Sequence, residues 1–196
     1  SVVGLGFGLG ITRVLEAGSS GFAYTIIGIG ATMGLGFWLG RALGVEDRVA
    51  SLISFGTAIC GGSAIAAMAP VIRADDEDTA VSLATVFSLN AVALLLFPVL
   101  GNLFGLTERQ FGLWSALAIH DTSSVVGAAS TFGSSALAIG TTVKLARAVW
   151  IAPSALIASR LTRTRTKTTI PLFILGFIAA AALRSWLPGL MDIWQT

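Results

Sequence analysis

Hydrophobic stretches of membrane-spanning length follow one another along almost the whole chain, and this feature constrains the fold more than any other. Apolar residues make up 55% of the sequence and charged residues only 11%, whereas soluble domains carry about 25% charged residues. Lipid offers no partner to a free backbone N–H or C=O, so such stretches are expected to be helices. We therefore predict an all-α, polytopic transmembrane helical bundle, with residues 1–196 forming a single transmembrane domain.

The hydropathy pattern separates the expected segments along the chain. They cover 1–11 (a partial segment), 22–40, 49–72, 79–104, 111–131, 135–159 and 169–188. The first is too short to cross the hydrocarbon layer, which takes roughly 20 residues, so we expect the chain to be part of a longer protein. Segment 22–40 carries glycines that let helices approach closely, and we expect its packing face to contain Gly28, Gly30, Gly34, Gly36 and Gly40.

Two similar runs of small and polar residues interrupt segments 49–72 and 111–131. Paired interruptions of this kind indicate the binding site of a transporter. The physical reason is that broken helix is tolerated only where it lines a cavity or packs inside protein, and the opened helix ends present partial charges to a ligand. We expect discontinuous helices here, which either cross the membrane or re-enter. The runs are Ala58-Ile59-Cys60-Gly61-Gly62-Ser63 and Ala118-Ile119-His120-Asp121-Thr122-Ser123.

Ionisable residues inside apolar segments are functional candidates, because burying charge in lipid is costly. Lys144 and Arg147 lie three residues apart, on one face of a helix. Within the segments, Asp121 is the one carboxylate that could accompany them. Two cations against one carboxylate leave about one positive charge uncompensated, and an anionic substrate would supply the missing negative charge. Alternatively, Asp121 pairs with Lys144 or Arg147, and the other cation meets a carboxylate outside this part of the longer protein.

Proton coupling is chemically available through Asp121 and His120. A carboxylate beside a lysine in a low-dielectric cavity can exchange protons, and an unperturbed histidine titrates near neutral pH. For His120, the alternative is a hydrogen-bonded histidine without a transport role.

Polar and small residues around the breaks complete the candidate substrate site. Hydroxyl and amide groups can donate to an oxyanion without adding charge, although serine and threonine also bond backbone carbonyls within their own helices. Cys60, the single cysteine, excludes an internal disulfide and a multi-cysteine metal site, and it is also a candidate packing residue. We expect no metal and no cofactor. Besides Lys144, Arg147, His120 and Asp121, the predicted substrate-binding residues are Thr57, Cys60, Gly61, Gly62, Ser63, Asn90, Thr122 and Ser123, with Ser124 beside them.

The distribution of basic residues predicts the orientation in the membrane, because cytoplasmic loops collect lysine and arginine. Loop 160–168 holds the densest basic group, namely Arg160, Arg163, Arg165 and Lys167, and we expect it to be cytoplasmic. Arg73 and Arg109 lie on opposite sides of the membrane whether the broken segments cross it or re-enter. If both segments re-enter, the two arginines exchange sides, and the excess of basic residues on the cytoplasmic side is unchanged. The acidic run 75–78 is expected to start the next helix, with Asp78 or Thr79 as its N-cap.

Three blocks of the sequence resemble the signatures of the bacterial sulfate exporter family, which comprises conserved integral membrane proteins. They are 56–72, 111–128 and 144–147, in the order and at the spacing of that family. The chain departs from the pattern at Gly62 and at Ser123-Ser124. The resemblance implies a relation to the cation/proton antiporter and bile-acid symporter superfamily, an inverted-repeat transporter fold with crossed, broken helices, and a bacterial inner (cytoplasmic) membrane location.

The leading functional hypothesis is a secondary active transporter of a small anion, with proton coupling as an option. The anion would be sulfate or an organic sulfonate or carboxylate. Its partners would be that anion, the lipid bilayer and a coupling proton or cation, with a homodimer left open. No basic patch with interleaved aromatic residues indicates nucleic acid.

Three alternatives to the anion transporter remain. A cation/proton antiporter would use Asp121 and Lys144. A non-transporting scaffold would gain nothing from its buried charges. An intramembrane hydrolase would use Ser63, His120 and Asp121, but an acid cannot readily orient the imidazole of its own neighbour. We therefore expect no enzymatic activity.

Overall fold

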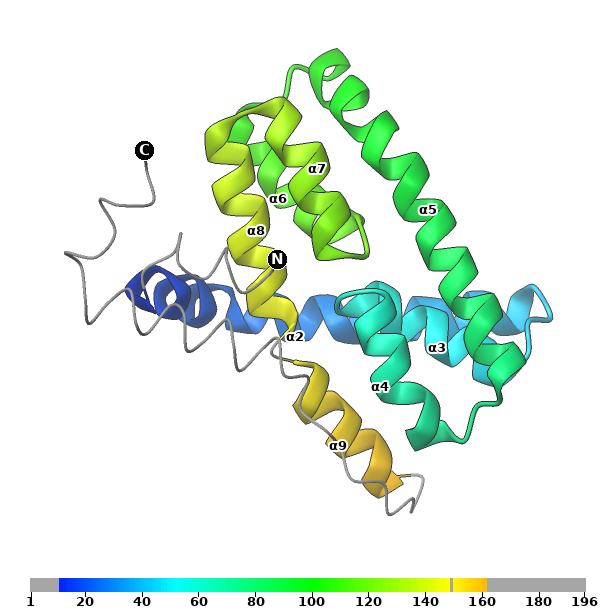
Figure 1. Cartoon of the computed structure of the whole chain (residues 1–196). Helices are drawn as coiled ribbons and strands as arrows, with labels where there is room; N and C mark the ends of the chain where they lie inside the picture. Colours follow the sequence, from blue (N-terminus) through cyan, green and yellow to red (C-terminus); the bar gives the residue numbers. More distant parts are fainter. Residues whose placement is uncertain (1–10, 149, 162–196) are drawn as a thin grey trace, which may run out of the picture.

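The computed structural model describes residues 11–148 and 150–161, and within these ranges its regular elements are all helices (Figure 1). The all-α prediction is confirmed. The expected partial segment up to residue 10, the expected segment 169–188 and the loop beyond Leu161 lie outside the described residues. The helices are α2 (Ile11–Ala42), α3 (Asp47–Ala58), α4 (Gly62–Ile72), α5 (Asp76–Leu103), α6 (Glu108–Ala118), α7 (Thr122–Phe132), α8 (Ser134–Ala148) and α9 (Ile151–Leu161).

Helix α5 is the longest continuous apolar helix among the described residues that could cross a membrane by length and composition. Its 28 residues extend over about 42 Å. The expected segment 79–104 corresponds to this helix, but the predicted N-cap was wrong. Asp75 is the N-cap and accepts a hydrogen bond from the backbone N–H of Asp78 at 2.8 Å, while the Asp78 carboxylate accepts one from the Asp75 N–H at 3.2 Å. This reciprocal capping places the acidic run at the N-cap and in the first turn, where the helix dipole favours negative charge.

The second broken segment folds back on itself as a hairpin of α6 and α7. Phe111, near the start of α6, stacks on Phe132, the last residue of α7, with ring centroids 3.9 Å apart. In one straight helix these residues would lie about 30 Å apart. Glu108 supports the base of this hairpin, because its Oε2 accepts a hydrogen bond from the backbone N–H of Ser135 at 2.8 Å. The segment therefore turns at its break and returns.

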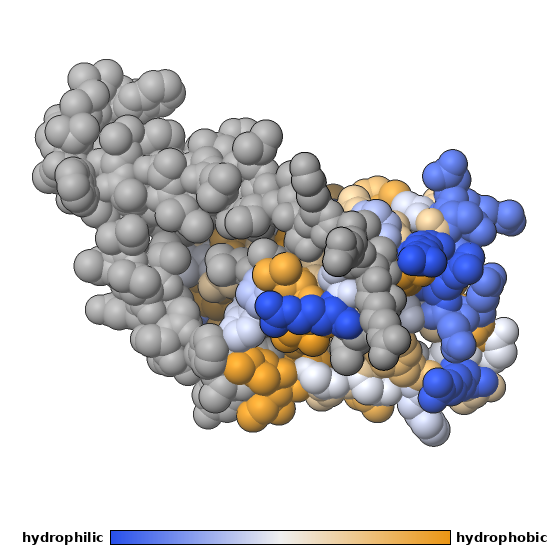
Figure 2. Space-filling view, turned by 90° about the horizontal axis from the view of Figure 1, so that it is seen from below, coloured by the Kyte–Doolittle hydropathy of each residue, from blue (hydrophilic) through white to orange (hydrophobic). Residues whose placement is uncertain are grey.

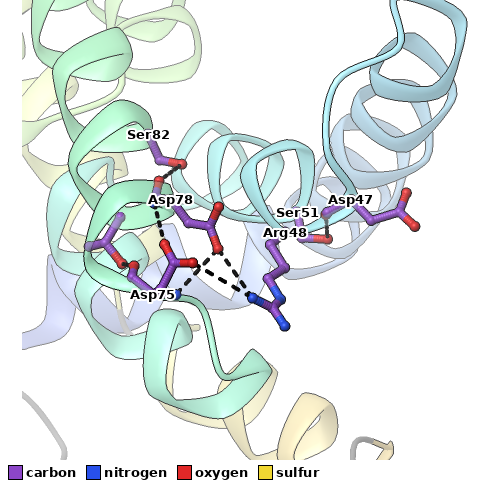
Figure 3. Close-up of polar contacts among 7 residues, drawn as sticks. Asp47, Arg48, Ser51, Asp75, Asp78 and Ser82 are labelled. Carbon is purple, nitrogen blue, oxygen red and sulfur yellow. Dashed lines mark hydrogen bonds and ion pairs between the residues drawn. The ribbon is translucent and has the colours of Figure 1, made fainter.

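The first broken segment is also a hairpin, made of α3 and α4. Arg48, in the first turn of α3, places its Nη1 3.7 Å from the Asp78 carboxylate and 3.9 Å from that of Asp75, both of which follow α4 in the chain (Figure 3). The two helices also pack closely, since a Cβ added to Gly56 would lie 2.9 Å from the Ile65 side chain. The start of α3 and the end of α4 thus lie at the same end of the hairpin.

The two hairpins point toward each other from opposite ends of α5 (Figure 1). The first hairpin joins the start of α5, and the second leaves from its end. Their tips meet where Gly61 packs against the second break: a Cβ added to Gly61 would lie 3.3 Å from the carbonyl carbon of His120 and 3.4 Å from the backbone nitrogen of Asp121. The expected discontinuous helices are present. Each broken segment folds back as a hairpin, which is the re-entrant one of the two expected arrangements, and the two hairpins meet at their tips.

Helix α2 packs against α3 through part of the expected glycine face. A Cβ at Gly36 would lie 2.1 Å from the Ser54 hydroxyl oxygen, and one at Gly40 would lie 2.6 Å from the Ala50 Cβ. Within the described residues, a Cβ at Gly28, Gly30 or Gly34 would meet nothing within 4 Å, so the described part of the structure confirms the predicted face at Gly36 and Gly40.

Helix α8 packs against both helices of the second hairpin. The expected segment 135–159 corresponds to α8, which ends at Ala148, and to α9, which begins at Ile151. Together the two helices cover residues 134–160, a stretch that could also cross a membrane by its length and composition.

The surface is divided between an apolar face along α5 and a hydrophilic end. Figure 2 shows hydrophilic side chains gathered at one end of the molecule, and the exposed charged residues of the loop before α3 and of the first turn of α5 belong to this region. Large apolar side chains remain exposed along α5, as lipid or further apolar chain would require. They include Val81, Phe87, Leu89, Val92, Leu95, Leu96 and Val99.

Candidate functional site

The candidate site lies where the two hairpin tips meet, beside the middle of α5. Asn90, buried near the midpoint of α5, holds the second tip with both ends of its amide. Its Nδ2 donates to the Asp121 carboxylate at 3.0 Å, and its Oδ1 accepts from the backbone N–H of His120 at 2.9 Å. The His120 ring nitrogen Nδ1 lies 3.2 Å from the same oxygen. This placement puts the predicted residues Asn90, His120 and Asp121 in one network, halfway along the α5 helix.

Asp121 is the N-cap of α7. Its Oδ1 accepts a hydrogen bond from the backbone N–H of Ser124 at 2.6 Å, and its Oδ2 accepts one from the Ser124 hydroxyl at 3.1 Å and one from Asn90. The carboxylate therefore sits at the positive end of a helix dipole, where negative charge is stabilised.

Lys144 is fully buried and binds the last turn of α6. Its Nζ donates to the carbonyl oxygen of Ile119 at 2.7 Å and lies 3.4 Å from that of Ala116. The final carbonyls of a helix have no partner within the helix, and a cation is favourable at this negative end. Lys144 thus completes the C-terminal end of α6.

Arg147 extends from α8 to both hairpins. Its Nη1 donates to the carbonyl of Leu117 in α6 at 3.4 Å, and its Nη2 donates to the carbonyl of Ala58, the last residue of α3. The side chain is buried, and its Nε has no hydrogen-bond partner among the described residues. Arg147 therefore satisfies two helix ends and keeps one donor unused.

The expected pairing of a buried cation with Asp121 is not found among the described residues. Lys144 and Arg147 contact no carboxylate within residues 11–148 and 150–161, because backbone carbonyls at helix C-termini take that place. Asp121 forms no ion pair with Lys144. The tips therefore hold two basic side chains and one carboxylate, each bound to a helix end.

The two breaks correspond residue by residue. Ala58 and Ala118 end the incoming helices, and Gly61 and Asp121 are the N-caps of the outgoing helices α4 and α7, sixty residues apart. The difference lies in the cap: Asp121 bonds the first turn of α7, whereas no side chain caps α4. Of the four helix ends at the tips, the start of α4 is the one without a charged side chain bound to it in the described part of the chain.

The other predicted site residues surround the tips at different depths. Cys60 is buried. The remaining candidates divide by exposure: Thr57, Gly62 and Thr122 are half-buried, and Ser63 and Ser123 are exposed at the starts of α4 and α7.

Sequence reasoning missed Thr141, which is 3% exposed and whose hydroxyl has no partner among the described residues. Its spacing from Lys144, on the same face of α8, was the available signal. The carbonyls that bind the two cations gave no signal at all.

An apolar groove of about 420 Å³ lies elsewhere, between α2, α3, α4 and α9, and contains none of the predicted site residues. Its lining is largely hydrophobic and holds no charged side chain, although the hydroxyl-bearing residues Ser51 and Ser154 also line it. Its walls include Ile29, Met33, Phe55, Met68, Ile72 and Ile157.

Comparison with known proteins shows relatives along the whole chain. The family described as conserved hypothetical protein 698 matches residues 1–195. A UPF0324 membrane protein of Geobacter sulfurreducens is 56% identical over 194 residues, which are 99% of this chain and 63% of the relative. A namesake from Bdellovibrio bacteriovorus is 50% identical over 200 residues, covering 98% of this chain and 62% of the relative. One from Porphyromonas gingivalis is 50% identical over 190 residues, covering 95% and 58% respectively.

The chain spans about three fifths of the length of these curated relatives. No solved structure matches it. The relatives are named membrane proteins, in agreement with the apolar helices, while the resemblance to sulfate exporters stays a prediction. From the match over nearly its full length, the chain belongs to the conserved hypothetical protein 698 family, a family of membrane proteins.

Proposed function

We propose that the chain is the core of a secondary active transporter for a small anion in the bacterial inner membrane. The anion is sulfate or an organic sulfonate or carboxylate. One observation carries the proposal: within residues 11–148 and 150–161, the start of α4 is the helix end at the tips without a charged partner, in a site that holds two buried cations and one carboxylate. An anion at the start of α4 would balance the excess positive charge of the site, and each helix end at the tips would then have a charged partner.

The start of α4 offers the groups that an oxyanion needs. The first backbone N–H groups of a helix have no intrahelical acceptor, and they point toward a bound anion. Gly62 and Ser63 supply such groups, and the Ser63 hydroxyl is a further donor. In this arrangement the substrate accepts hydrogen bonds from the first turn of α4, as the Asp121 carboxylate does from the first turn of α7.

The arrangement of the hairpins suits transport. The hairpins come from opposite ends of α5, and their tips meet beside Asn90 at its middle. Transporters commonly bind their substrate near the bilayer midplane, between discontinuous helices of inverted repeats. A relative movement of the two tips would expose an anion at the start of α4 first to one side and then to the other.

The arginines of the described residues favour one orientation. Arg48 and Arg73 lie at the end of the molecule where α5 begins, and Arg109 lies where α5 ends. Arg41 in the last turn of α2 and Arg160 in that of α9 add to the first group. The positive-inside rule then places the start of α5 in the cytoplasm. Both hairpins are re-entrant in this topology.

The competing antiporter hypothesis requires Asp121 to exchange Lys144 for a cation. Lys144 instead donates to two backbone carbonyls, and three donors occupy the Asp121 carboxylate. This pattern favours the anion transporter. His120, which is half-buried beside Asn90, is our candidate for proton coupling.

The test is uptake of radiolabelled sulfate by proteoliposomes that contain the intact protein, with and without a pH gradient. An organic sulfonate and a carboxylate serve as competitors. Ser63→Asp would place a carboxylate in the first turn of α4, and Ser63→Asn is its neutral, isosteric control. We expect saturable uptake that falls roughly tenfold in Ser63→Asp and is retained in Ser63→Asn, because a carboxylate at a helix start occupies the place of the anion.

Two results would count against the proposal. Equal uptake by the two Ser63 variants would remove the start of α4 as the anion site. Cation-driven proton flux, with no uptake of any of the three anions, would instead support the antiporter.

A further inference from the structure

We infer that Arg147 is the positioning residue that fastens the two hairpin tips to each other, and that breaking its bond to the Ala58 carbonyl lets the first hairpin move away from the second. The inference rests on the proposed function in one respect: it assumes that the two hairpin tips move relative to each other during transport. Its structural basis is that one buried guanidinium donates to the end of α3 and to the end of α6.

The polar contacts at the tips are unevenly distributed. Asn90, Lys144 and Arg147 all bind the second tip, at or just before residues 118–122. Among these three side chains, Arg147 alone also binds the first tip, at Ala58. Among the described residues, these side chains thus anchor the second tip to both α5 and α8, whereas of the three only Arg147 bonds to the first tip.

Direct polar contact between the tips does not replace this link. Within the described residues, no hydrogen bond joins residues 58–62 to residues 118–122. What holds them besides Arg147 is the packing of Gly61 against the backbone of His120 and Asp121. Packing between small groups can separate without leaving a buried polar atom unpaired, so the Arg147 bond is the specific polar fastening.

The chemistry of the bond fits a reversible fastening. A guanidinium–carbonyl bond is charge-assisted and therefore stronger than a neutral one. Its acceptor is a carbonyl at the end of α3, where helix carbonyls lack intrahelical partners. The Nε of Arg147 has no partner in the part of the chain that the structure describes, so the guanidinium has a donor available for another acceptor when it leaves Ala58.

The cysteine at the first tip provides a direct readout of this separation. Cys60 lies two residues after Ala58 and is 5% exposed, so it should react slowly with a membrane-permeant maleimide while the tips are closed. The experiment measures its alkylation rate in intact protein, in lipid nanodiscs, with Cys60 as the sole cysteine. The variants are Arg147→Gln, Arg147→Lys, and Lys144→Gln as the matched control, since Lys144 is equally buried but binds only the second hairpin.

We expect Arg147→Gln to raise the Cys60 alkylation rate by about tenfold to a hundredfold, because removing a charge-assisted bond raises the open population by that factor. Arg147→Lys should restore part of the protection, since an ammonium can bind one of the two carbonyls. Lys144→Gln should change the rate less than about twofold. Unchanged alkylation in Arg147→Gln, or an equal rise in Lys144→Gln, would overturn the inference.

A second reporter distinguishes tip separation from unfolding. Ser115 is fully buried in α6, so Ser115→Cys in a Cys60→Ser background reports on the second hairpin and α8. It should stay protected when Arg147 is replaced by glutamine. If it reacts as fast as Cys60, Arg147 is a general stabilising residue and the inference fails. Alkylation of Cys60 can be measured without any transport. An alkylation result that contradicts the role of Arg147 can therefore be told apart from an absence of sulfate uptake, which would contradict the proposed transport function.

Discussion

Gly61 and Asp121 are the N-cap residues of α4 and α7, and they lie against each other where the hairpin tips meet. A Cβ on Gly61 would be 3.4 Å from the backbone nitrogen of Asp121. One position therefore needs the absence of a side chain, and the other needs a carboxylate. The predictions below test what each of these requirements contributes.

Gly61→Ala should be strongly destabilising. Gly61 has a φ of 69° and a ψ of −127°, a conformation that is essentially restricted to glycine, and its Cβ would press on His120 at 3.3 Å. We expect a loss of about 1–3 kcal/mol in the free energy of unfolding, together with loss of transport. Gly105→Ala is the control, with a φ of 62° and open space around the Cβ, and should cost only about 1 kcal/mol. Thermal unfolding in detergent measures both, and equal losses would contradict the role of tip packing.

Exchanging the two side chains of the Asn90–Asp121 pair should rescue the damage of either single change. Asp121→Asn places an amide NH₂ against the Asn90 Nδ2, and Asn90→Asp places two carboxylates together. Each should cost about 1–3 kcal/mol, because a buried polar group loses its partner. The double variant again pairs a donor with an acceptor and keeps an acceptor for the His120 N–H. Comparing unfolding free energies in this double-mutant cycle tests the pairing, and additive losses would refute it.

Two glycines on α2 should respond in opposite directions to the same substitution. In Gly36→Ala the new methyl group would fall 2.1 Å from the Ser54 hydroxyl oxygen, so α2 and α3 must move apart at a cost of about 1–3 kcal/mol. In Gly34→Ala the methyl group meets nothing within 4 Å, and the higher helix propensity of alanine should stabilise by up to about 1 kcal/mol. Melting temperatures of the two variants decide the matter. A stable Gly36→Ala variant would show that the contact is loose.

The base of the first hairpin should depend more on the cap than on the ion pair. Asp75→Ala removes the N-cap of α5 and should cost about 1 kcal/mol. Arg48→Gln removes an exposed arginine whose contacts to Asp75 and Asp78 are 3.9 and 3.7 Å long, and it should cost less than about 1 kcal/mol. Denaturant unfolding of the two variants gives the comparison. A larger loss in Arg48→Gln would mean that the ion pairs close the hairpin.

The sequence predicted the features that hydropathy and local chemistry encode. The apolar run of α5 was recognisable because it is continuous, and both breaks were recognisable because small and polar residues interrupt apolar segments. Asn90, His120 and Asp121 were assigned to one site, and the structure brings them together. Their chemistry in apolar surroundings was a sufficient signal.

The direction of the chain after each break could not be predicted, because a crossing helix and a returning hairpin have the same hydropathy. The stacking of Phe111 on Phe132 settles it for the second hairpin. The partners of Lys144 and Arg147 were hidden for a different reason. They are backbone carbonyls, which every residue carries, so no residue type in the sequence marks them.

The length of α5 limits how this chain can change. The hairpins are built from helices of 11 or 12 residues, and α5 has 28 residues with Asn90 near its centre. One inserted turn on either side of Asn90 would shift one hairpin by about 5.4 Å relative to the other and break the register of their tips. Insertions should therefore be tolerated at 43–46 or 104–107, outside the helices, and selected against within α5. Helix α5 carries little of the chemistry itself, but its length sets the distance between the two hairpins, which carry most of it.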